Sequence, residues 1–227
     1  MKQFAKDSFH ISLMPRNSIN CYIVEGYLVD SGIRSSFKKI SAAFKKVPAH
    51  THILTHAHSD HQGSTQKICE IHKIPLLCHK LEVWRTETGF VTYEYPNRKN
   101  ILAKFQQRYW AGNGCKVDHT LKENDFVGNF RVIETPGHSS GHISLFREQD
   151  GVLIIGDAAT NMDLLTSCTG LNLPPSIFTT DQRRNLDSLR KLAALNPKII
   201  CFGHGPILYN NGKQFEKFVE NVSRYQS

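Results

Sequence analysis

Residues 55–63 read Thr-His-Ala-His-Ser-Asp-His-Gln-Gly and place four potential metal ligands within six residues. His56 and His58 are two residues apart, so on an extended chain their side chains face the same way. Asp60 and His61 then fall at a turn, where the chain changes direction. Four potential ligands crowded into six residues cannot all reach one small ion. We therefore expect two neighbouring ions, one held by His56 and His58 and the other by Asp60 and His61.

Three further candidate ligands each follow a short apolar run that predicts a strand. His138 follows Phe130–Ile133, Asp157 follows Val152–Ile155, and His204 follows Ile199–Phe202. Each lies in a turn flanked by glycine, which lets the backbone bend tightly. Because α/β folds place their sites at the carboxyl ends of strands, we expect these side chains to converge. For Asp157 alone, capping of a turn is the competing interpretation.

The ligand types suggest how two ions would be shared. One set is His56, His58 and His138, and the other is Asp60, His61 and His204, with Asp157 as the bridge. Imidazole and carboxylate mixtures suit Zn²⁺, and also Fe²⁺ or Mn²⁺. Two such ions would lower the pKa of a shared water toward neutrality and supply a nucleophile, with no Ser or Cys nucleophile required.

The rest of the chain predicts a layered α/β domain. Apolar β-type runs also occur at Phe9–Leu13, Cys21–Val24, Tyr27–Val29, His52–Leu54, Leu76–Leu77 and Ile143–Phe146. Helical spacing of apolar residues predicts helices at Ser35–Lys46, Gln62–Lys73, Asp181–Leu195 (with Asp181 as N-cap) and Gly212–Tyr225. We expect one domain over residues 1–227, with two packed sheets, helices outside, and an aromatic-rich insertion at about 81–118.

Composition excludes several classes of protein. With 40% hydrophobic residues the 227-residue chain can bury a core, and it contains no apolar run long enough for a membrane span. The start has no signal-peptide pattern, and none of the six cysteines forms a C-x-x-C pair, so we expect a reduced, cytoplasmic protein. The net charge of +8 (28 basic minus 20 acidic residues) is spread without a basic block. We therefore expect a small-molecule substrate rather than nucleic acid or a membrane, and the oligomeric state stays open.

The twelve histidines divide into two groups. Five are the candidate ligands above. Six others are expected to be surface or packing residues, namely His10, His50, His52, His72, His79 and His119. The remaining one, His142, lies four residues after His138, so both a place beside the metal site and a plain strand position are open.

These motifs together resemble the metallo-β-lactamase superfamily. The H-x-H-x-D-H cluster is followed in order by T-P-G-H, G-D and G-H-G, and Asn20–Val24 with Leu28–Gly32 is similar to the family's opening hairpin. The resemblance runs from about residue 9 to residue 206. It implies a four-layer αβ/βα sandwich with a dinuclear site at one edge, in which Asp30 supports the metal-binding loop.

Departures within that family narrow the class. Asp157 makes the chain more similar to the glyoxalase II, lactonase and phosphodiesterase branches than to classical metallo-β-lactamases. Thr160 stands where quorum-quenching lactonases carry Tyr, which weakens the lactonase interpretation. Only 23 residues follow His204, so the C-terminal helical domain with which glyoxalase II binds glutathione is not expected.

The resulting hypothesis is a dinuclear metal-dependent hydrolase. A metal-bridging hydroxide, oriented by Asp60 as the catalytic residue, would cleave an ester, thioester or lactone bond of a small molecule, with metal charge stabilising the oxyanion. The insertion Leu81–Trp110 would form a substrate wall, or simply a packed lid. The alternatives are a phosphodiesterase or nuclease, a mononuclear iron oxygenase of persulfide type, and a metal-dependent binding module without turnover.

Overall fold

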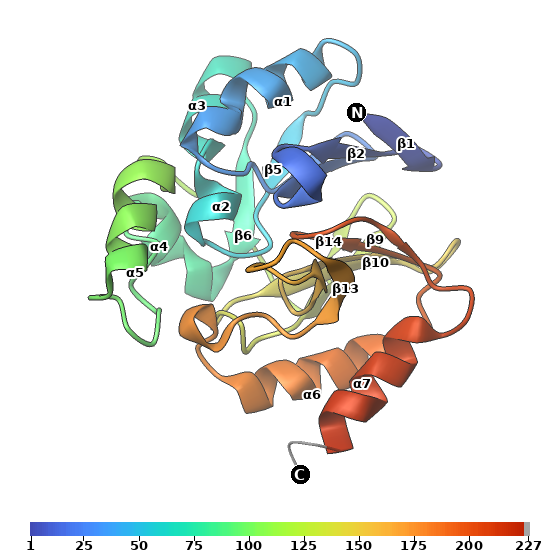
Figure 1. Cartoon of the computed structure of the whole chain (residues 1–227). Helices are drawn as coiled ribbons and strands as arrows, with labels where there is room; N and C mark the ends of the chain where they lie inside the picture. The colour runs from blue at the N-terminus through green and yellow to red at the C-terminus, as the bar shows by residue number, and fades with distance from the viewer. Residues whose placement is uncertain (225–227) are drawn as a thin grey trace.

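The computed structural model describes residues 1–224 and stacks two β-sheets between two layers of helices (Figure 1). In this part of the chain the first sheet runs in the order β1 (Lys2–Ala5), β2 (Ser8–Ser12), β3 (Asn20–Val24), β4 (Tyr27–Val29), β5 (Thr51–Ile53), β6 (Leu76–His79) and β7 (His119–Leu121). The second runs in the order β15 (Leu208–Tyr209), β14 (Ile199–Phe202), β11 (Val152–Gly156), β10 (Ile143–Arg147), β9 (Phe130–Glu134) and β8 (Phe126–Val127). Helices α1 (Phe37–Phe44) and α3 (Thr65–His72) cover the first sheet, and α6 (Gln182–Ala193) and α7 (Gln214–Arg224) cover the second. The predicted four-layer α/β sandwich is confirmed.

The strands that precede the candidate ligands end at one edge of each sheet. In the first sheet β4, β5 and β6 are parallel. In the second sheet β11 and β14 are parallel, and β9 shares their direction because β9 and β11 are both antiparallel to β10. In the first sheet, Asp30 therefore lies at the carboxyl end of β4 and residues 55–61 follow the carboxyl end of β5. In the second sheet, His138 follows β9, Asp157 follows β11 and His204 follows β14.

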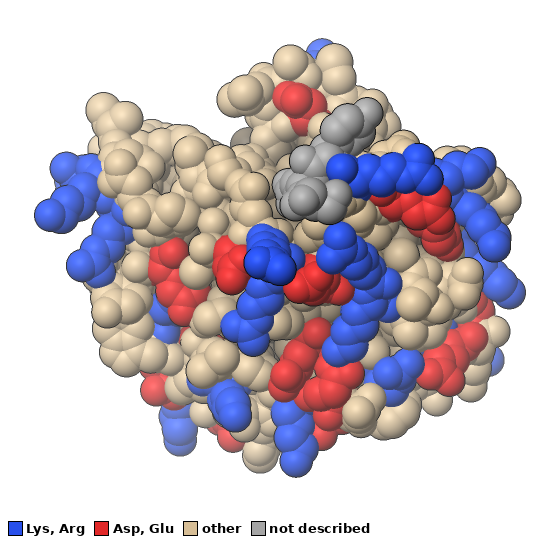
Figure 2. Space-filling view, turned by 90° about the horizontal axis from the view of Figure 1, so that it is seen from below, with Lys and Arg blue, Asp and Glu red and all other residues tan. Residues whose placement is uncertain are grey.

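Helix α6 illustrates how the outer layers form. The side chain of Asp181 accepts a hydrogen bond from the backbone N–H of Arg184 and caps the helix, as predicted. Leu189 and Leu192 lie three residues apart and pack against the second sheet. Figure 2 views this side of the molecule and shows Lys and Arg interspersed with Asp and Glu. On this face the positive excess does not gather into a basic block.

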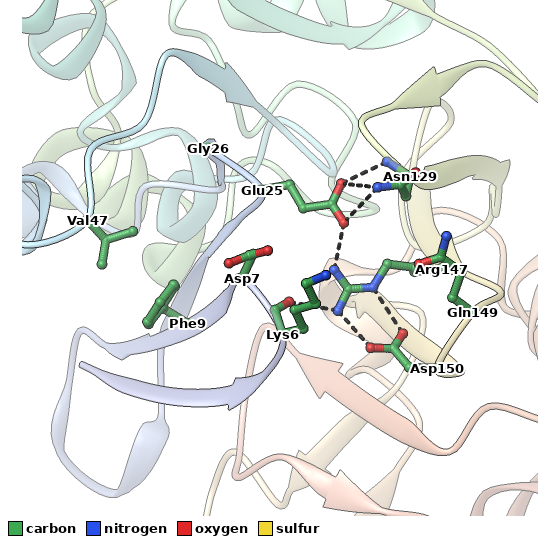
Figure 3. A pocket seen from close by; sticks show the side chains of 10 residues that line it. All are labelled: Lys6, Asp7, Phe9, Glu25, Gly26, Val47, Asn129, Arg147, Gln149 and Asp150. Carbon is green, nitrogen blue, oxygen red and sulfur yellow. Dashed lines mark hydrogen bonds and ion pairs between the residues drawn. The ribbon is translucent and has the colours of Figure 1, made fainter.

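A buried guanidinium holds the two sheets together at the far edge (Figure 3). Arg147 ends β10 beside the start of β11, opposite the end that leads to Asp157. Its Nη1 donates to Glu25 Oε1 at 2.8 Å, and its Nε and Nη2 donate to Asp150 at 3.0 and 2.8 Å. Nη2 also donates to the carbonyl of Lys6 at 3.0 Å. Because these interactions satisfy the guanidinium, we assign the cluster a structural role.

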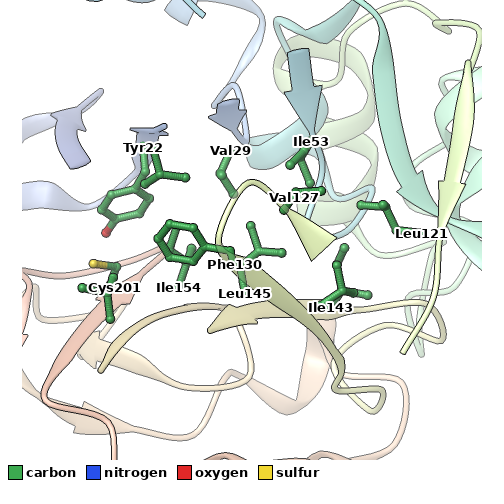
Figure 4. Packing of buried hydrophobic residues seen from close by; sticks show 13 residues of the cluster. Tyr22, Val29, Ile53, Leu121, Val127, Phe130, Ile143, Leu145, Ile154 and Cys201 are labelled. Atoms are coloured by element: carbon green, nitrogen blue, oxygen red, sulfur yellow. The ribbon is translucent and has the colours of Figure 1, made fainter. Parts of the chain in front are cut away.

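The space between the sheets is filled by apolar side chains (Figure 4). Strand β3 contributes to two layers, because successive side chains on a strand point to opposite faces. Tyr22 and Val24 join the core between the sheets, whereas Cys21 and Ile23 pack under α1 and α3. Cys201 enters the central core from the second sheet. Both cysteines are buried free thiols, as expected of small hydrophobic residues.

The prediction of a single helix at Gln62–Lys73 is wrong in one respect. The chain forms α2 (Ser59–Gln62) and then α3, with a break at Gly63. Gly63 lies so close to the loop after β4 that a Cβ there would be 2.4 Å from the backbone nitrogen of Arg34, and its own N–H donates to Gly32 at 2.7 Å. Close backbone contact of this kind requires glycine, and it ends the first helix after one turn.

Two segments beyond the sheets lie near the same edge. Between β6 and β7 the chain forms η3 (Lys80–Glu82), α4 (Val83–Thr88), α5 (Ile101–Phe105) and the π-helical turn η4 (Gln106–Trp110). After β11 it forms a hairpin, β12 (Thr160–Met162) and β13 (Thr169–Asn172), and the short turn η5 (Ser176–Phe178), none of which the sequence predicted. Among residues 1–224 no helix has both the length and the apolar character needed to cross a membrane.

Candidate functional site

The seven predicted ligand residues lie together at the edge where their strands end. Their donor atoms form three groups, and within each group the atoms lie within 4.8 Å of one another. The groups are His56, His58 and His138; Asp60, His61 and His204; and His56, His61 and Asp157. The first two are the two sets that the sequence predicted, and the third joins one set to the other.

Several buried polar atoms in this cluster have no hydrogen-bond partner within the described chain. They are Nε2 of His56, His58, His61 and His138, and Oδ1 of Asp157. Buried polar atoms are normally paired, and leaving several unpaired in one place is costly. Imidazole nitrogens and carboxylate oxygens are ligands of divalent transition metals such as Zn²⁺. The residues therefore fit a bound metal.

Asp157 occupies the position between the two ligand sets. Its Oδ2 lies 3.7 Å from Nε2 of His138, which belongs to one set. The same oxygen lies 3.3 Å from Nε2 of His61 and 3.0 Å from Nε2 of His204, which belong to the other. A single carboxylate thus faces both sets, as a bridging ligand must.

The second ring nitrogen of four of these histidines is held by the surrounding fold. The Nδ1 partners are Thr55 Oγ1 for His56 (3.0 Å), Asp30 Oδ2 for His61 (2.9 Å), Thr179 Oγ1 for His138 (3.2 Å) and the carbonyl of Ser18 for His204 (2.5 Å). Such contacts fix the orientation of each ring, so that Nε2 points into the cluster.

Asp30 has the contacts expected of a residue that supports the metal-binding loop. Its Oδ1 accepts a hydrogen bond from the backbone N–H of Thr55, and its Oδ2 accepts one from the Thr55 hydroxyl, both at 2.8 Å. Oδ2 also contacts Nδ1 of His61 at 2.9 Å. Asp30 therefore touches the start of the loop and one of its candidate ligands.

The buried histidines differ in the direction of their pKa shifts. Burial, together with the charge of neighbouring histidines, lowers the pKa of His56 and His58 well below the usual value. Burial also lowers the pKa of His138 to about 4, against the opposing charge of Asp157. For His204, burial is outweighed by the charge of Asp157 and by hydrogen bonds to Asp157 and Asp60, so its pKa rises to about 10. One ligand set is thus neutral near pH 7, whereas the other retains a proton when no metal is bound.

His142 lies beside the cluster rather than at a plain strand position. Its Nε2 accepts a hydrogen bond from the backbone N–H of Asp157 at 3.0 Å, and its ring lies 5.0 Å from that of His56. Burial lowers its pKa to about 3, so the ring is neutral and can accept this bond. It therefore holds the backbone of the candidate bridging residue.

Sequence reasoning missed a buried carboxylate that joins two of the ligand loops. Glu82 is fully buried; its Oε2 accepts a hydrogen bond from the backbone N–H of Ala57 at 2.8 Å. Its Oε1 accepts bonds from the Ser139 hydroxyl at 2.7 Å and the Gly141 N–H at 2.9 Å. Ala57 lies between His56 and His58, and Ser139 follows His138 in the chain. Glu82 thus connects the loops that carry one complete ligand set.

A buried arginine completes this arrangement. Nη2 of Arg85 lies 2.6 Å from Oε1 of Glu82, and its Nη1 lies 2.5 Å from Oε2 of Glu94. Glu94 in turn accepts hydrogen bonds from the backbone and hydroxyl of Ser140 at 3.0 and 2.6 Å. The only sequence signal was the i, i+3 spacing of Glu82 and Arg85, which is equally typical of an exposed helix face.

A cavity of about 590 Å³ opens onto the candidate ligands His58, Asp60, His138, Asp157 and His204. The insertion supplies part of its wall, namely Tyr95, Leu102, Gln106 and Trp110. A second part of the wall comes from residues 160–178, of which sequence reasoning considered only Thr160. Other aromatic residues of the insertion (Trp84, Phe90, Tyr93, Phe105 and Tyr109) do not line the cavity and pack mainly against one another at the surface. Part of the insertion thus lines a cavity at the candidate ligands, while its other rings pack together at the surface. That a substrate lies along this part of the insertion stays a prediction.

Comparison with known proteins agrees with this geometry. Residues 14–204 match the family model of the metallo-beta-lactamase superfamily. The probable metallo-hydrolase YybB of Bacillus subtilis is 31% identical over 88% of this chain and 83% of its own length. The probable metallo-hydrolase YflN of the same organism is 33% identical over 72% of this chain, and the match spans 66% of that relative. The crystal structure of TTHA1623 in a di-iron-bound form superposes with a TM-score of 0.67 at 25% identity, covering 88% of this chain and 94% of that one.

Proposed function

Since the chain belongs to the metallo-β-lactamase superfamily, we propose that it is a dinuclear metal-dependent hydrolase that cleaves an ester, thioester or lactone bond of a small molecule. The observation that carries this proposal is a group of buried Nε2 atoms and an Asp157 oxygen that lie close together and make no hydrogen bond within residues 1–224. His56, His58 and His138 would hold one ion, Asp60, His61 and His204 the other, and Asp157 would bridge them. Divalent ions bound there would activate a water molecule and polarise the substrate carbonyl.

The chain's own residues have distinct tasks in this reaction. Asp60 lines the cavity, and its Oδ2 lies 3.4 Å from Nε2 of His204. Although burial alone would raise the pKa of Asp60, the hydrogen bond from His204 and the nearby histidine charges lower it. Asp60 is therefore ionised near neutral pH and can orient the attacking water and accept its proton at a carboxylate oxygen. His142 and Asp30 keep Asp157 and His61 in place.

The identity of the metal and the cellular location of the protein are further parts of the proposal. We propose zinc as the metal, with iron or manganese as alternatives, and the di-iron form of TTHA1623 supports keeping iron in the test. We also propose a cytoplasmic protein, supported by six cysteines that are all free thiols.

A panel of chromogenic substrates tests the proposed reaction. Protein loaded with zinc, iron or manganese is assayed against an ester, a thioester, a lactone and a phosphodiester. We expect carboxyl-ester-type turnover to exceed phosphodiester turnover, and the reverse order would favour the phosphodiesterase alternative instead. His58→Ala should lose metal from one site and nearly all activity. His119→Ala, which replaces an exposed histidine of β7, should retain both.

A further inference from the structure

The cavity at the candidate metal site is lined mainly by apolar side chains. Six of its large apolar residues are Leu102, Trp110, Leu164, Leu173, Ile177 and Phe178, and we refer to them as the acyl wall. Tyr95 connects this wall to the ligands, because its ring lies 4.8 Å from that of His58 and 5.2 Å from that of Phe178. A substrate with its reacting bond at the ligands would therefore place the rest of the molecule along the acyl wall.

Of the described residues that line the cavity, none offers a cationic Lys or Arg side chain to an anionic group of the substrate, although Gln106, Thr160 and Asn172 are among its polar lining residues. Beyond the candidate ligands Asp60 and Asp157, its one acid is Asp163, whose Oδ1 accepts hydrogen bonds from the backbone N–H groups of Leu165 and Thr166 at 2.9 and 2.7 Å. Asp163 thus stabilises its own turn, and its charge would repel an anion. A substrate carboxylate or phosphate that entered the cavity would lose its hydration, and no Lys or Arg side chain would compensate for that cost.

The mouth of the cavity exposes large apolar side chains to water. Leu165 is 96% exposed, Ile177 46% and Leu102 40%, and all three line the cavity. They come from both walls, the insertion and residues 160–178. Exposed apolar residues gathered at the rim of a cavity are typical of a binding site for an apolar ligand. A bound aliphatic chain would remove both its own surface and theirs from water.

We propose that the preferred substrate is an uncharged ester, thioester or lactone with an aliphatic acyl chain, which lies along the acyl wall. This inference rests on the proposed function for its reacting bond and adds the substrate class. Each methylene buried on the wall should raise kcat/KM by about fourfold. An octanoyl ester, which is four methylenes longer than a butanoyl ester, should therefore exceed it on the order of 200-fold if the whole chain is buried.

A chain-length series with matched variants is the first test. Zinc-loaded protein is assayed with neutral nitrophenyl esters from acetyl to dodecanoyl. Ile177→Asp places a charge on the acyl wall and should lower the octanoyl-to-acetyl ratio of kcat/KM at least tenfold. Ile71→Asp changes an isoleucine that is 56% exposed on α3, outside the cavity, and should leave the ratio unchanged. A ratio near one in the wild type would overturn the proposal.

Binding without metal is the second test and does not depend on turnover. The chain contains two tryptophans, so in Trp84→Phe the only remaining one is Trp110 on the acyl wall. Titration of this metal-free variant with decanamide should change its fluorescence saturably, whereas acetamide should not. Adding Ile177→Asp should weaken decanamide binding at least tenfold. Absence of any decanamide response would contradict the proposal.

The two tests separate this inference from the proposed function. Turnover of all esters at equal kcat/KM, without decanamide binding, would refute the acyl wall and retain the hydrolase. Decanamide binding with no turnover of any ester would refute the hydrolase and retain the apolar site. A thioester carrying carboxylates, such as a hydroxyacylglutathione, that is cleaved with a higher kcat/KM than the neutral octanoyl ester would also overturn the inference.

Discussion

Replacing Glu82 by glutamine tests whether one buried carboxylate holds the two loops of a ligand set. The substitution preserves the shape of the side chain but leaves one acceptor oxygen where the carboxylate has two. If that oxygen keeps the bonds from Ser139, Gly141 and Arg85, the amide NH₂ group faces the N–H of Ala57, which is itself a donor. In the opposite orientation the three other contacts are lost instead. No rotamer of glutamine satisfies the whole cluster.

The loss of stability expected for Glu82→Gln can be estimated from these contacts. Leaving the buried N–H of Ala57 unpaired costs about 1–3 kcal/mol. Removing the charge also weakens the bond to Arg85, and hydrogen bonds to charged groups contribute about 1.5–3 kcal/mol each. Glu94 still pairs with Arg85, so we expect a total loss of about 3–5 kcal/mol, the range found for broken buried ion pairs. For a chain of this size that corresponds to a fall in Tm of roughly 6–20 °C.

Thermal unfolding of the metal-free protein measures the loss of stability, and a zinc competition titration measures the loss of zinc affinity. Besides the lower Tm, Glu82→Gln should bind zinc about 10–100-fold more weakly, as supporting residues of metal sites do when replaced. Glu148→Gln is the control, because Glu148 also pairs with an arginine (Arg131, 3.0 Å) but its side chain is 70% exposed. It should change stability by about 1 kcal/mol or less. A Glu82→Gln protein with the Tm and the zinc affinity of the wild type would refute this reasoning.

Three further predictions concern the other ligand set. Asp30→Asn should weaken zinc binding about 10–100-fold, because Nδ1 of His61 loses its charged partner, and the zinc titration above would detect it. Gly203→Ala should abolish binding of the second ion in metal analysis, since its Cβ would lie 2.1 Å from Oδ1 of Asp157 and 2.7 Å from Cε1 of His61; full occupancy would refute this. The raised pKa of His204, about 10 against 6.5, means that its pairing stabilises the metal-free protein fully below pH 6.5 and is lost as pH rises through about 10. Tm of the metal-free protein should therefore fall between pH 7 and 10, and an unchanged Tm would contradict this assignment.

The candidate ligands could be predicted because each follows a strand that its own residues specify. His138, Asp157 and His204 come within four residues of the ends of buried apolar strands, and parallel strands bring such positions to one edge. The cluster at residues 56–61 needs only a strand followed by a helical turn, and both are encoded locally. Spacing and strand direction were enough to bring these residues together without knowledge of any tertiary contact.

Glu82 and the second wall of the cavity could not be predicted in this way. Glu82 acts through the backbone of Ala57 and Gly141, residues 25 and 59 positions away, and no local pattern specifies such contacts. Residues 160–178 form a short hairpin and a turn with an irregular apolar pattern, so their position depends on the loops they pack against. The break at Gly63 likewise depends on a backbone neighbour about thirty residues earlier in the chain.

The candidate ligands and the walls of the cavity come from different parts of the fold. The candidate ligands lie at the ends of core strands, where packing on both faces of each sheet fixes their positions. The acyl wall comes from α5, η4 and residues 160–178, which contribute little to the core between the sheets. Changes in those segments can alter the shape and polarity of the cavity while Nε2 of His56, His58 and His138 remain in place. Family membership therefore indicates a metal-dependent site, whereas the substrate must be inferred from the walls of this particular cavity.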